Sequence, residues 1–155
     1  MKEFMTQFSD FAFIERIHTT LEEGSYNKPT PIQAQAIPYA LEGKDILGIA
    51  QTGTGKTAAF SLPSLNRLAS KTLGTGKYQT RMLVLAPTRE LATQIAESMT
   101  KYGKGLGLYI TTAFGGVPIN RQKRILQKGV DVLVATPGRL LDLYEQNALD
   151  LNMVE

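Results

Sequence analysis

The sequence contains no cysteine, no tryptophan and a single histidine. A disulfide scaffold and a thiolate metal centre are therefore excluded, and one histidine cannot build a metal cluster alone. No apolar stretch reaches the roughly 18 residues that a membrane span requires. What remains is a chain of 155 residues with 43% apolar and 20% charged residues, a balance typical of one globular domain. The lack of cysteine is compatible with a reducing compartment, and we expect a cytoplasmic protein.

The net charge of +3 is unevenly distributed along the chain. Residues 1–45 carry four basic and seven acidic side chains, and residues 140–155 carry four acids and no base. Residues 71–104 carry six bases and two acids, and residues 115–139 carry five bases and one acid. A basic middle between acidic ends makes a polyanion a candidate partner, against the alternative of an ordinary mixed surface.

Helical and strand patterns alternate along the chain. The predicted helices cover residues 11–23, 30–41, 56–68, 89–102, 119–127 and 140–146. The predicted strands cover residues 45–50, 81–86, 108–113 and 130–135. This alternation indicates an α/β fold with a mostly parallel sheet flanked by helices.

Three of the predicted strands, those ending at Ala50, Ala86 and Ala135, are followed at once by a turn and a helix. In an open parallel sheet, ligands bind at the carboxyl ends of the strands, and the helix N-termini found there suit phosphate groups. Three such strand ends along one edge of the sheet could bind several successive phosphates. The alternative is that Thr88 and Thr136 are only helix N-caps.

The loop after the first predicted strand carries a phosphate-binding pattern. Residues 50–57 read AQTGTGKT, which departs from the P-loop G-x-x-x-x-G-K-[ST] only in its first residue. Gly53 and Gly55 allow backbone N–H groups to turn inward around oxygen atoms. Lys56 supplies a positive charge to the terminal phosphates, and the Thr57 hydroxyl can complete a Mg²⁺ coordination shell.

Gln33 has two interpretations. Thr30-Pro-Ile-Gln33 reads as a capping box, in which the Gln33 amide accepts the backbone N–H of Thr30. A glutamine amide can also pair bidentately with adenine, and Tyr26 nearby could stack on the base. The residues alone leave both interpretations open.

Taken together, these segments resemble the N-terminal RecA-like lobe of the DEAD-box ATP-dependent RNA helicases, over nearly the whole chain. Residues 24–33 resemble the Q motif of that family, which reads adenine, and residues 50–57 resemble its motif I, where alanine in first position is the family form. Residues 87–91 resemble motif Ia, residues 115–116 the glycine doublet, and residues 136–139 motif Ib.

The resemblance implies ATP and Mg²⁺ as cofactors and RNA as a partner, bound through its backbone without sequence preference. The implied ATP-binding residues are Tyr26, Lys28, Gln33, Gln51, Thr52, Gly53, Thr54, Gly55, Lys56 and Thr57, with Lys56 and Thr57 catalytic and Thr57 the Mg²⁺ ligand. The implied RNA-binding residues are Pro87, Thr88, Arg89, Gly115, Gly116, Thr136, Pro137, Gly138 and Arg139. The basic helix with Arg121, Lys123, Arg124 and Lys128 is as compatible with solvation as with RNA contact.

The pattern that carries hydrolysis in this family has no counterpart in the sequence. In the family an Asp-Glu-Ala-Asp motif ends a strand; its first acid organises Mg²⁺ and its second positions the attacking water. Asp45 and Asp131 instead lie at or near the starts of predicted strands. A Ser-Ala-Thr motif and the second lobe with its arginine fingers are also absent. We therefore expect an incomplete lobe, inactive by itself, with an unpaired apolar edge near Ile46–Ala50.

The expected organisation is one partial N-terminal RecA-like helicase domain over residues 1–155. It would comprise a Q-motif helical region at residues 1–44 and a P-loop α/β core at residues 45–155. In the parent helicase, ATP would bridge this lobe and a second RecA-like lobe. Two alternatives stay open: another P-loop NTPase, which the Q motif and motif Ib argue against, or a truncated non-enzymatic module that binds nucleotide or RNA.

Overall fold

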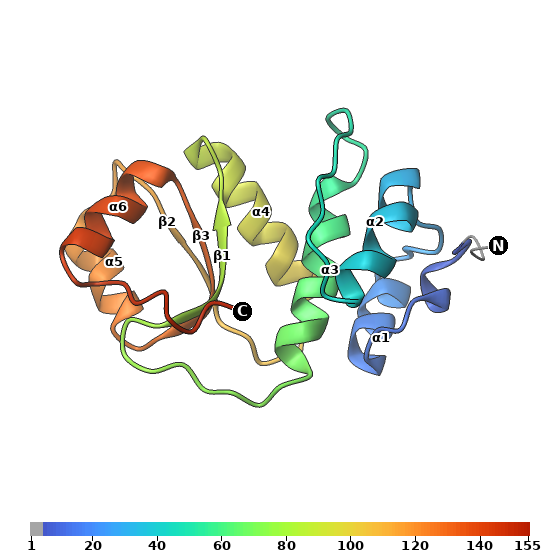
Figure 1. Cartoon of the computed structure of the whole chain (residues 1–155), viewed down its shortest axis with the longest axis horizontal. Helices are drawn as coiled ribbons and strands as arrows, with labels where there is room; N and C mark the ends of the chain where they lie inside the picture. The colour runs from blue at the N-terminus through green and yellow to red at the C-terminus, as the bar shows by residue number, and fades with distance from the viewer. Residues whose placement is uncertain (1–4) are drawn as a thin grey trace. The chain divides into compact units, whose positions relative to one another are not determined.

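The computed structural model describes residues 5–155, which fall into two compact units (Figure 1). The first unit contains residues 1–71 and 101–107, and the second contains residues 72–100 and 108–155. The start of the predicted domain, at residues 1–4, lies outside the described residues. Within residues 5–155, no helix has both the length and the apolar character needed to cross a lipid bilayer.

The first unit is helical. Its elements are the 3₁₀ turn η1 (Phe8–Asp10) and the helices α1 (Glu15–Glu23), α2 (Pro31–Leu41) and α3 (Lys56–Ala69). Helix α2 packs against α3, and the apolar side chains of Ile37, Leu62 and Leu65 are almost completely buried. The unit therefore has an apolar core of its own, which fixes the start of α3 relative to α2.

The helix predicted over residues 11–23 begins only at Glu15. Phe8, Phe11 and Phe13 are buried in a row, with ring centroids 5.9 and 5.6 Å apart, so these side chains pack together instead of following a helical stripe. Ile14 is extended, and its backbone N–H donates to the Asn66 side-chain oxygen at 2.7 Å. This long-range bond sets the start of the helix and could not be inferred from local periodicity.

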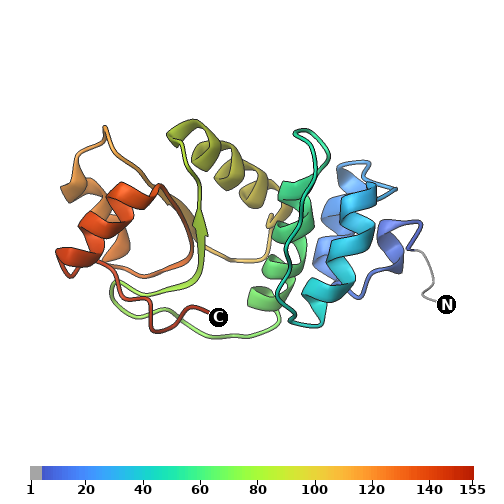
Figure 2. The same cartoon turned by 45° about the horizontal axis from the view of Figure 1, so that its top comes forward.

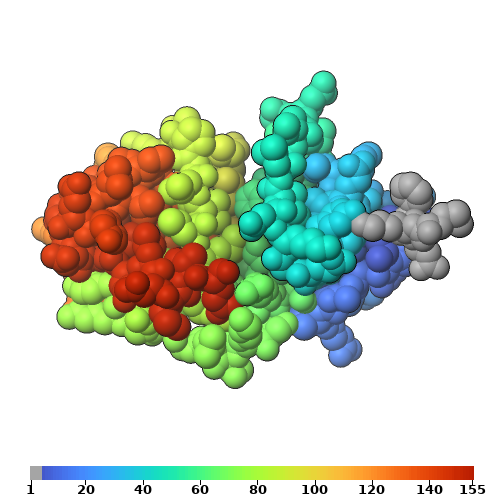
Figure 3. All heavy atoms as spheres, in the orientation of Figure 1, coloured from blue at the N-terminus to red at the C-terminus, as the bar shows by residue number. Residues whose placement is uncertain are grey.

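The strand predicted over residues 45–50 is not formed. The segment is irregular, and Leu47 and Ile49 are 89% and 85% exposed. The whole segment between α2 and α3 lies on the surface in the space-filling view (Figure 3). A strand is stable only when its backbone groups pair with a neighbour, and among the described residues no strand pairs with this one. Apolar side chains are thus exposed near Ile46–Ala50, but not as the expected edge of a sheet, because the segment is not a strand.

The second unit contains a parallel sheet of three strands, β1 (Thr80–Leu85), β2 (Ile110–Ala113) and β3 (Val130–Ala135), in the order β1-β3-β2. Val134 lies opposite Val84 on one side and Thr112 on the other. Strand β3 is central and almost entirely buried, which explains its continuous run of apolar residues. The α/β fold with a parallel sheet is thus confirmed.

Helices cover both faces of this sheet. Helices α5 (Ile119–Leu126) and α6 (Pro137–Glu145) lie on one side, and α4 (Arg89–Tyr102), which belongs to this unit as far as Thr100, lies on the other (Figure 2). Leu126, Leu133 and Leu143 share one apolar cluster on the α5–α6 side. Helix α6 begins three residues earlier than predicted, because Pro137 occupies its first turn, where proline is favoured.

Candidate nucleotide and RNA sites

The loop before α3 has the geometry of a phosphate-binding loop. Gly53 and Gly55 adopt φ values of +80° and +87°, which are strained for any residue with a Cβ atom. The Lys56 ammonium group donates to the carbonyl oxygen of Ala50 at 2.5 Å, and the Thr54 hydroxyl donates to that of Gln51 at 2.6 Å. The loop therefore curls back on itself directly before the N-terminus of α3, where backbone N–H groups suit an anion.

Gln33 ties this loop to the N-terminus of α2. Its side chain is 6% exposed; its amide oxygen accepts the Thr30 N–H at 2.9 Å, and its amide nitrogen donates to the Gly55 carbonyl oxygen at 3.1 Å. A Cβ on Gly55 would lie 2.3 Å from that nitrogen, so the close approach also requires glycine. The predicted capping bond from Gln33 is present. The amide keeps one N–H and one oxygen lone pair for another partner.

Tyr26 and Lys28 line a hollow of about 320 Å³ together with Phe8 and His18, and no residue of the phosphate loop borders it. The Tyr26 ring lies edge-on to Tyr102, with centroids 5.9 Å apart. A Cβ on Gly24 would lie 2.5 Å from the Tyr26 ring, so Gly24 makes room for it.

The hydroxyl of Tyr26 accepts a hydrogen bond of 2.8 Å from the Lys101 ammonium group. This bond raises the pKa of Lys101 above its ordinary value, because it favours the charged form. Burial raises the pKa of the neighbouring Tyr102. Sequence reasoning missed both residues, since they follow Tyr26 by more than seventy positions and carry no motif.

The side chains near the phosphate loop suit Mg²⁺ only if phosphate oxygens supply further ligands. Among residues 5–155, no group of three or more His, Asp or Glu side chains is placed to hold a metal ion. Thr57, the second residue of α3, is half-buried next to the phosphate loop. A single hydroxyl beside phosphate oxygens and water is a usual Mg²⁺ environment.

The second unit brings the three remaining motifs to one edge of its sheet. Thr88 follows β1, the doublet Gly115–Gly116 follows β2, and Thr136 follows β3. Because the strands are parallel, these positions share the carboxyl edge, where the Thr136 N–H donates to the Ala113 carbonyl oxygen at 3.1 Å. The carboxyl edge thus carries two helix N-termini and a glycine turn.

The two threonines of the carboxyl edge differ in their hydrogen bonds. The Thr88 hydroxyl accepts the Leu91 N–H at 3.2 Å, so Thr88 is a helix N-cap, which was the alternative to a phosphate-binding role. Thr136 is also in N-cap position, but its side chain makes no capping bond. Its hydroxyl is therefore not used by the helix.

The two arginines of the carboxyl edge contact the turn after β2. The Arg89 guanidinium lies over the Phe114 ring, 5.2 Å from its centroid, and a Cβ on Gly116 would lie 2.4 Å from Arg89 Nη1. Arg139 Nη1 donates to the Val117 carbonyl oxygen at 2.8 Å and to the Gln122 side chain at 2.9 Å.

Gln122 is buried and holds the same turn from the other side, since its amide nitrogen donates to the Phe114 carbonyl oxygen at 3.0 Å. Phe114 and Gln122 were not singled out from the sequence. Pro87, Pro137 and Gly138 are exposed on the carboxyl edge, and a Cβ on Gly138 would meet nothing within 4 Å.

The predicted site residues thus divide between the units. All ten implied for ATP lie in the first unit: Tyr26, Lys28, Gln33, Gln51, Thr52, Gly53, Thr54, Gly55, Lys56 and Thr57. All nine implied for RNA lie in the second: Pro87, Thr88, Arg89, Gly115, Gly116, Thr136, Pro137, Gly138 and Arg139.

Comparison with known proteins gives consistent matches. The family model described as DEAD/DEAH box helicase matches residues 30–155. The chain is 46% identical over 153 residues to proteins named ATP-dependent RNA helicase DeaD from Klebsiella pneumoniae and from Escherichia coli (strain K12). The alignment covers 98% of this chain but 23% and 24% of those relatives, so the chain spans about a quarter of their length.

A solved structure is also similar. The crystal structure of a DEAD box protein from the hyperthermophile Methanococcus jannaschii superposes with a TM-score of 0.85 at 31% sequence identity. The match covers 97% of this chain and 40% of the solved chain.

Proposed function

Because this chain belongs to the DEAD/DEAH box helicase family, we propose that it supplies the ATP-binding and RNA-backbone-contacting part of the first RecA-like lobe of an ATP-dependent RNA helicase. The lobe it belongs to is incomplete in these residues, with the Q-motif helical region at 1–44 and the P-loop core at 45–155. The whole protein is an ATP hydrolase of the cytoplasm, in which a second RecA-like lobe completes the nucleotide site.

The observation that carries this proposal is the hydrogen bond from the Gln33 amide to the Gly55 carbonyl oxygen. It couples a residue suited to reading adenine to the loop suited to binding phosphate. The unused N–H and lone pair of the amide match adenine N7 and N6, and Tyr26 and Lys28 complete the base side of the site.

Phosphate binding falls to the loop and to the N-terminus of α3. Lys56, which here donates to the Ala50 carbonyl oxygen, would hold the terminal phosphates, and the Thr57 hydroxyl would be a ligand of Mg²⁺. When bound, ATP with Mg²⁺ supplies the phosphoryl group whose transfer to water drives the family's cycle. The backbone N–H groups of Gln51–Gly55 would hold the phosphates, and Lys56 would supply the positive charge of the loop.

RNA binding falls to the carboxyl edge of the sheet in the second unit. Backbone N–H groups at the N-termini of α4 and α6, the Thr136 hydroxyl and the two arginines suit phosphate oxygens and present no pattern that reads bases. Binding is therefore independent of sequence and weakened by salt.

Calorimetric titration of ATP and GTP into the intact protein tests the nucleotide part of the proposal. We expect Lys56→Ala to weaken both nucleotides by about 1.5–3 kcal/mol, the range for hydrogen bonds to charged groups. We expect wild-type protein to prefer ATP. Equal affinity for both nucleotides, or no effect of the lysine, would instead favour a non-enzymatic module or another kind of P-loop protein.

A further inference from the structure

A second basic surface lies on the unit that carries the carboxyl edge, at the other end of its strands. Tyr109 directly precedes β2, and Lys128 lies two residues before β3. With Arg121, Arg124, Ile125 and Gln127 these residues line a surface hollow of about 550 Å³, which we call the Tyr109 hollow. Strand β3 has six residues, so at a rise of about 3.3 Å per residue Lys128 lies roughly 20 Å from the carboxyl edge. Arg121 lies between the two ends, since its neighbour Gln122 bonds the turn after β2.

The positive charges of the Tyr109 hollow come from Arg121 and Arg124 of α5 and from Lys128 in the turn that follows it. Arg121, Arg124 and Lys128 recur at helical spacing, and all three are exposed. No carboxylate of the described residues lies within ion-pair distance of them, and no acidic side chain lines the hollow. Cations at a helix C-terminus complement its dipole, but this does not account for Arg121, which lies in the first turn.

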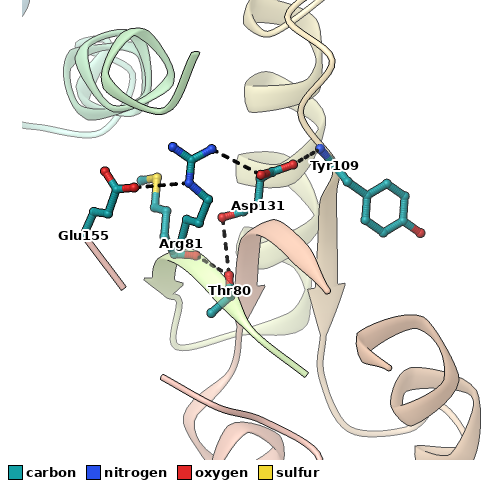
Figure 4. A network of polar contacts seen from close by, with 6 residues as sticks. Thr80, Arg81, Tyr109, Asp131 and Glu155 are labelled. Atoms are coloured by element: carbon teal, nitrogen blue, oxygen red, sulfur yellow. Dashed lines mark hydrogen bonds and ion pairs between the residues drawn. The ribbon is translucent and has the colours of Figure 1, made fainter. Parts of the chain in front are cut away.

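Tyr109 presents an aromatic ring from a fixed backbone. Its N–H donates to the Asp131 carboxylate at 2.8 Å, and its carbonyl oxygen accepts the N–H groups of Asp131 and Val132 at 2.9 and 3.1 Å. The ring points away from this network, and Tyr109 is 51% exposed (Figure 4).

Asp131, the acid nearest to the hollow along β3, has its other carboxylate oxygen 3.4 Å from Nη1 of the buried Arg81. Arg81 in turn contacts Glu155 at 3.2 Å. Asp131, which accepts the Tyr109 N–H, is therefore also paired with Arg81. The charged side chains that line the hollow are all cationic.

We propose that the Tyr109 hollow is a second RNA-binding site, in which a base of a single strand stacks on Tyr109 while Arg121, Arg124 and Lys128 hold the neighbouring phosphates. An exposed ring inside a positively charged groove is the combination by which proteins bind single-stranded nucleic acids without reading sequence. The inference rests on the proposed function, because it takes the carboxyl edge as the primary RNA site. Since Tyr109 and Lys128 lie at the opposite end of the strands from the carboxyl edge, only a strand long enough to extend beyond that edge reaches them.

Strand length therefore provides the test. Single-stranded sites take roughly 4–16 nucleotides per domain, so we would titrate the intact protein with fluorescent RNA strands of about 6 and about 20 nucleotides. We expect Arg124→Ala combined with Lys128→Ala to leave the short strand unaffected. For the long strand, the slope of log K against log salt should fall by about 1.4, which is about 0.7 for each of the two phosphates that the variant no longer neutralises.

Matched variants distinguish RNA binding in the hollow from a general effect of lost positive charge. Lys123→Ala removes a charge from the same helix, but Lys123 does not line the hollow, so we expect long-strand affinity to stay within twofold of wild type. Tyr109→Leu should weaken the long strand roughly fivefold or more because the base no longer stacks on a ring, whereas Tyr109→Phe, which keeps the ring, should bind like wild type. A strand carrying 4-thiouridine should crosslink to Tyr109.

Several results would overturn the inference while leaving the proposed function intact. These are equal losses for Lys123→Ala and Arg124→Ala, equal losses for short and long strands, or no crosslink at Tyr109 from a strand that crosslinks at the carboxyl edge. Binding of polyglutamate or anionic vesicles through Tyr109 and Arg124, with no loss of RNA binding, would assign the hollow to another partner. If wild-type protein binds neither strand, the proposed function itself fails.

Discussion

The side-chain amide of Gln33 donates to the carbonyl oxygen of Gly55 at 3.1 Å, while its oxygen accepts the N–H of Thr30 at 2.9 Å. One buried side chain thus stabilises the start of α2 and also holds the phosphate loop. The two interpretations that the sequence left open for this glutamine are compatible in the structure, because the amide can make both bonds and still face a base.

The first prediction separates these two roles of Gln33. Gln33→Glu keeps an oxygen for the Thr30 N–H but removes the N–H donor, whereas Gln33→Ala removes both. Both variants also lose the bond to Gly55, which affects ATP and GTP alike, so we expect them to weaken ATP by about 1–3 kcal/mol more than GTP, by analogy with other bidentate base contacts. Calorimetry with both nucleotides is the measurement.

Thermal melting supplies the control for that comparison. Both variants should lower stability: Gln33→Ala by about 1 kcal/mol through the lost capping bond, and Gln33→Glu because it puts a buried carboxylate beside the Gly55 carbonyl oxygen. If Gln33→Glu binds ATP as tightly as wild type does, the amide does not read the base.

The second prediction concerns the glycine doublet. Gly116 has φ of +79°, and a Cβ there would lie 2.4 Å from Arg89 Nη1, whereas Gly115 has no positive φ and open space around it. Gly116→Ala should displace Arg89 and weaken RNA binding, with about 1–2 kcal/mol of backbone strain. Gly115→Ala is the matched control and should bind RNA like wild type. Anisotropy titrations in which both variants behave alike would show that Arg89 is not positioned by this turn.

The third prediction separates phosphate contact from positioning at Arg139. Arg139→Ala should weaken all RNA sequences alike and lower the salt slope by up to about 0.7, the share of one phosphate contact. Gln122→Leu removes one of the two acceptors that hold Arg139 Nη1 but keeps the charge. It should weaken RNA binding without changing the slope. Unchanged slopes in both variants would make Arg139 a positioning residue only.

The fourth prediction concerns the buried charges of the second unit. Arg81 is 2% exposed and contacts the carboxylates of Asp131 and Glu155. Arg81→Met keeps most of the volume but leaves two carboxylates in a buried site, so we expect a loss of about 3–5 kcal/mol in the free energy of unfolding.

The control for Arg81 is an exposed ion pair. Lys104 lies 3.3 Å from Glu23, and their side chains are 67% and 51% exposed. Lys104→Ala should cost less than about 1 kcal/mol, because such pairs are screened by water and salt. Denaturant unfolding of both variants would decide; a similar small cost for Arg81→Met would mean that water or rearrangement compensates the two acids.

Strand β3 could be predicted because its apolar run is buried on both faces. Residues 45–50 show the same kind of run, yet remain irregular, since a run of apolar residues does not say whether a partner strand lies beside it. Burial of β3 and the missing partner of residues 45–50 were therefore predictable, whereas the irregular conformation of that segment was not.

Within the sites, the sequence revealed the residues that belong to local motifs and missed those that act through distant contacts. The phosphate loop and the Gln33 capping bond follow from neighbouring residues. The hydrogen bonds from Lys101 to Tyr26 and from Arg139 to Gln122, in contrast, join positions far apart in the sequence. Thr88 and Thr136 look alike in the sequence, but only the hydroxyl of Thr88 caps its helix, a difference set by side-chain rotation.

The fifth prediction concerns hydrolysis by these 155 residues alone. In the part of the chain that the structure describes, Asp131 is engaged by Arg81 and Tyr109, and no acidic cluster is placed to organise Mg²⁺. We therefore expect no ATP turnover above background for residues 1–155. Turnover that Lys56→Ala abolishes would show that other residues of the chain do this work.

The measurement that tests the central claim most directly is ATP turnover by the intact protein with and without RNA. The account predicts that RNA of any sequence stimulates turnover, that Lys56→Ala abolishes it under all conditions, and that Arg89→Ala raises the RNA concentration needed without changing turnover in its absence. Turnover that does not respond to RNA, or that responds equally in wild type and Arg89→Ala, would contradict the assignment of ATP to the first unit and RNA to the second.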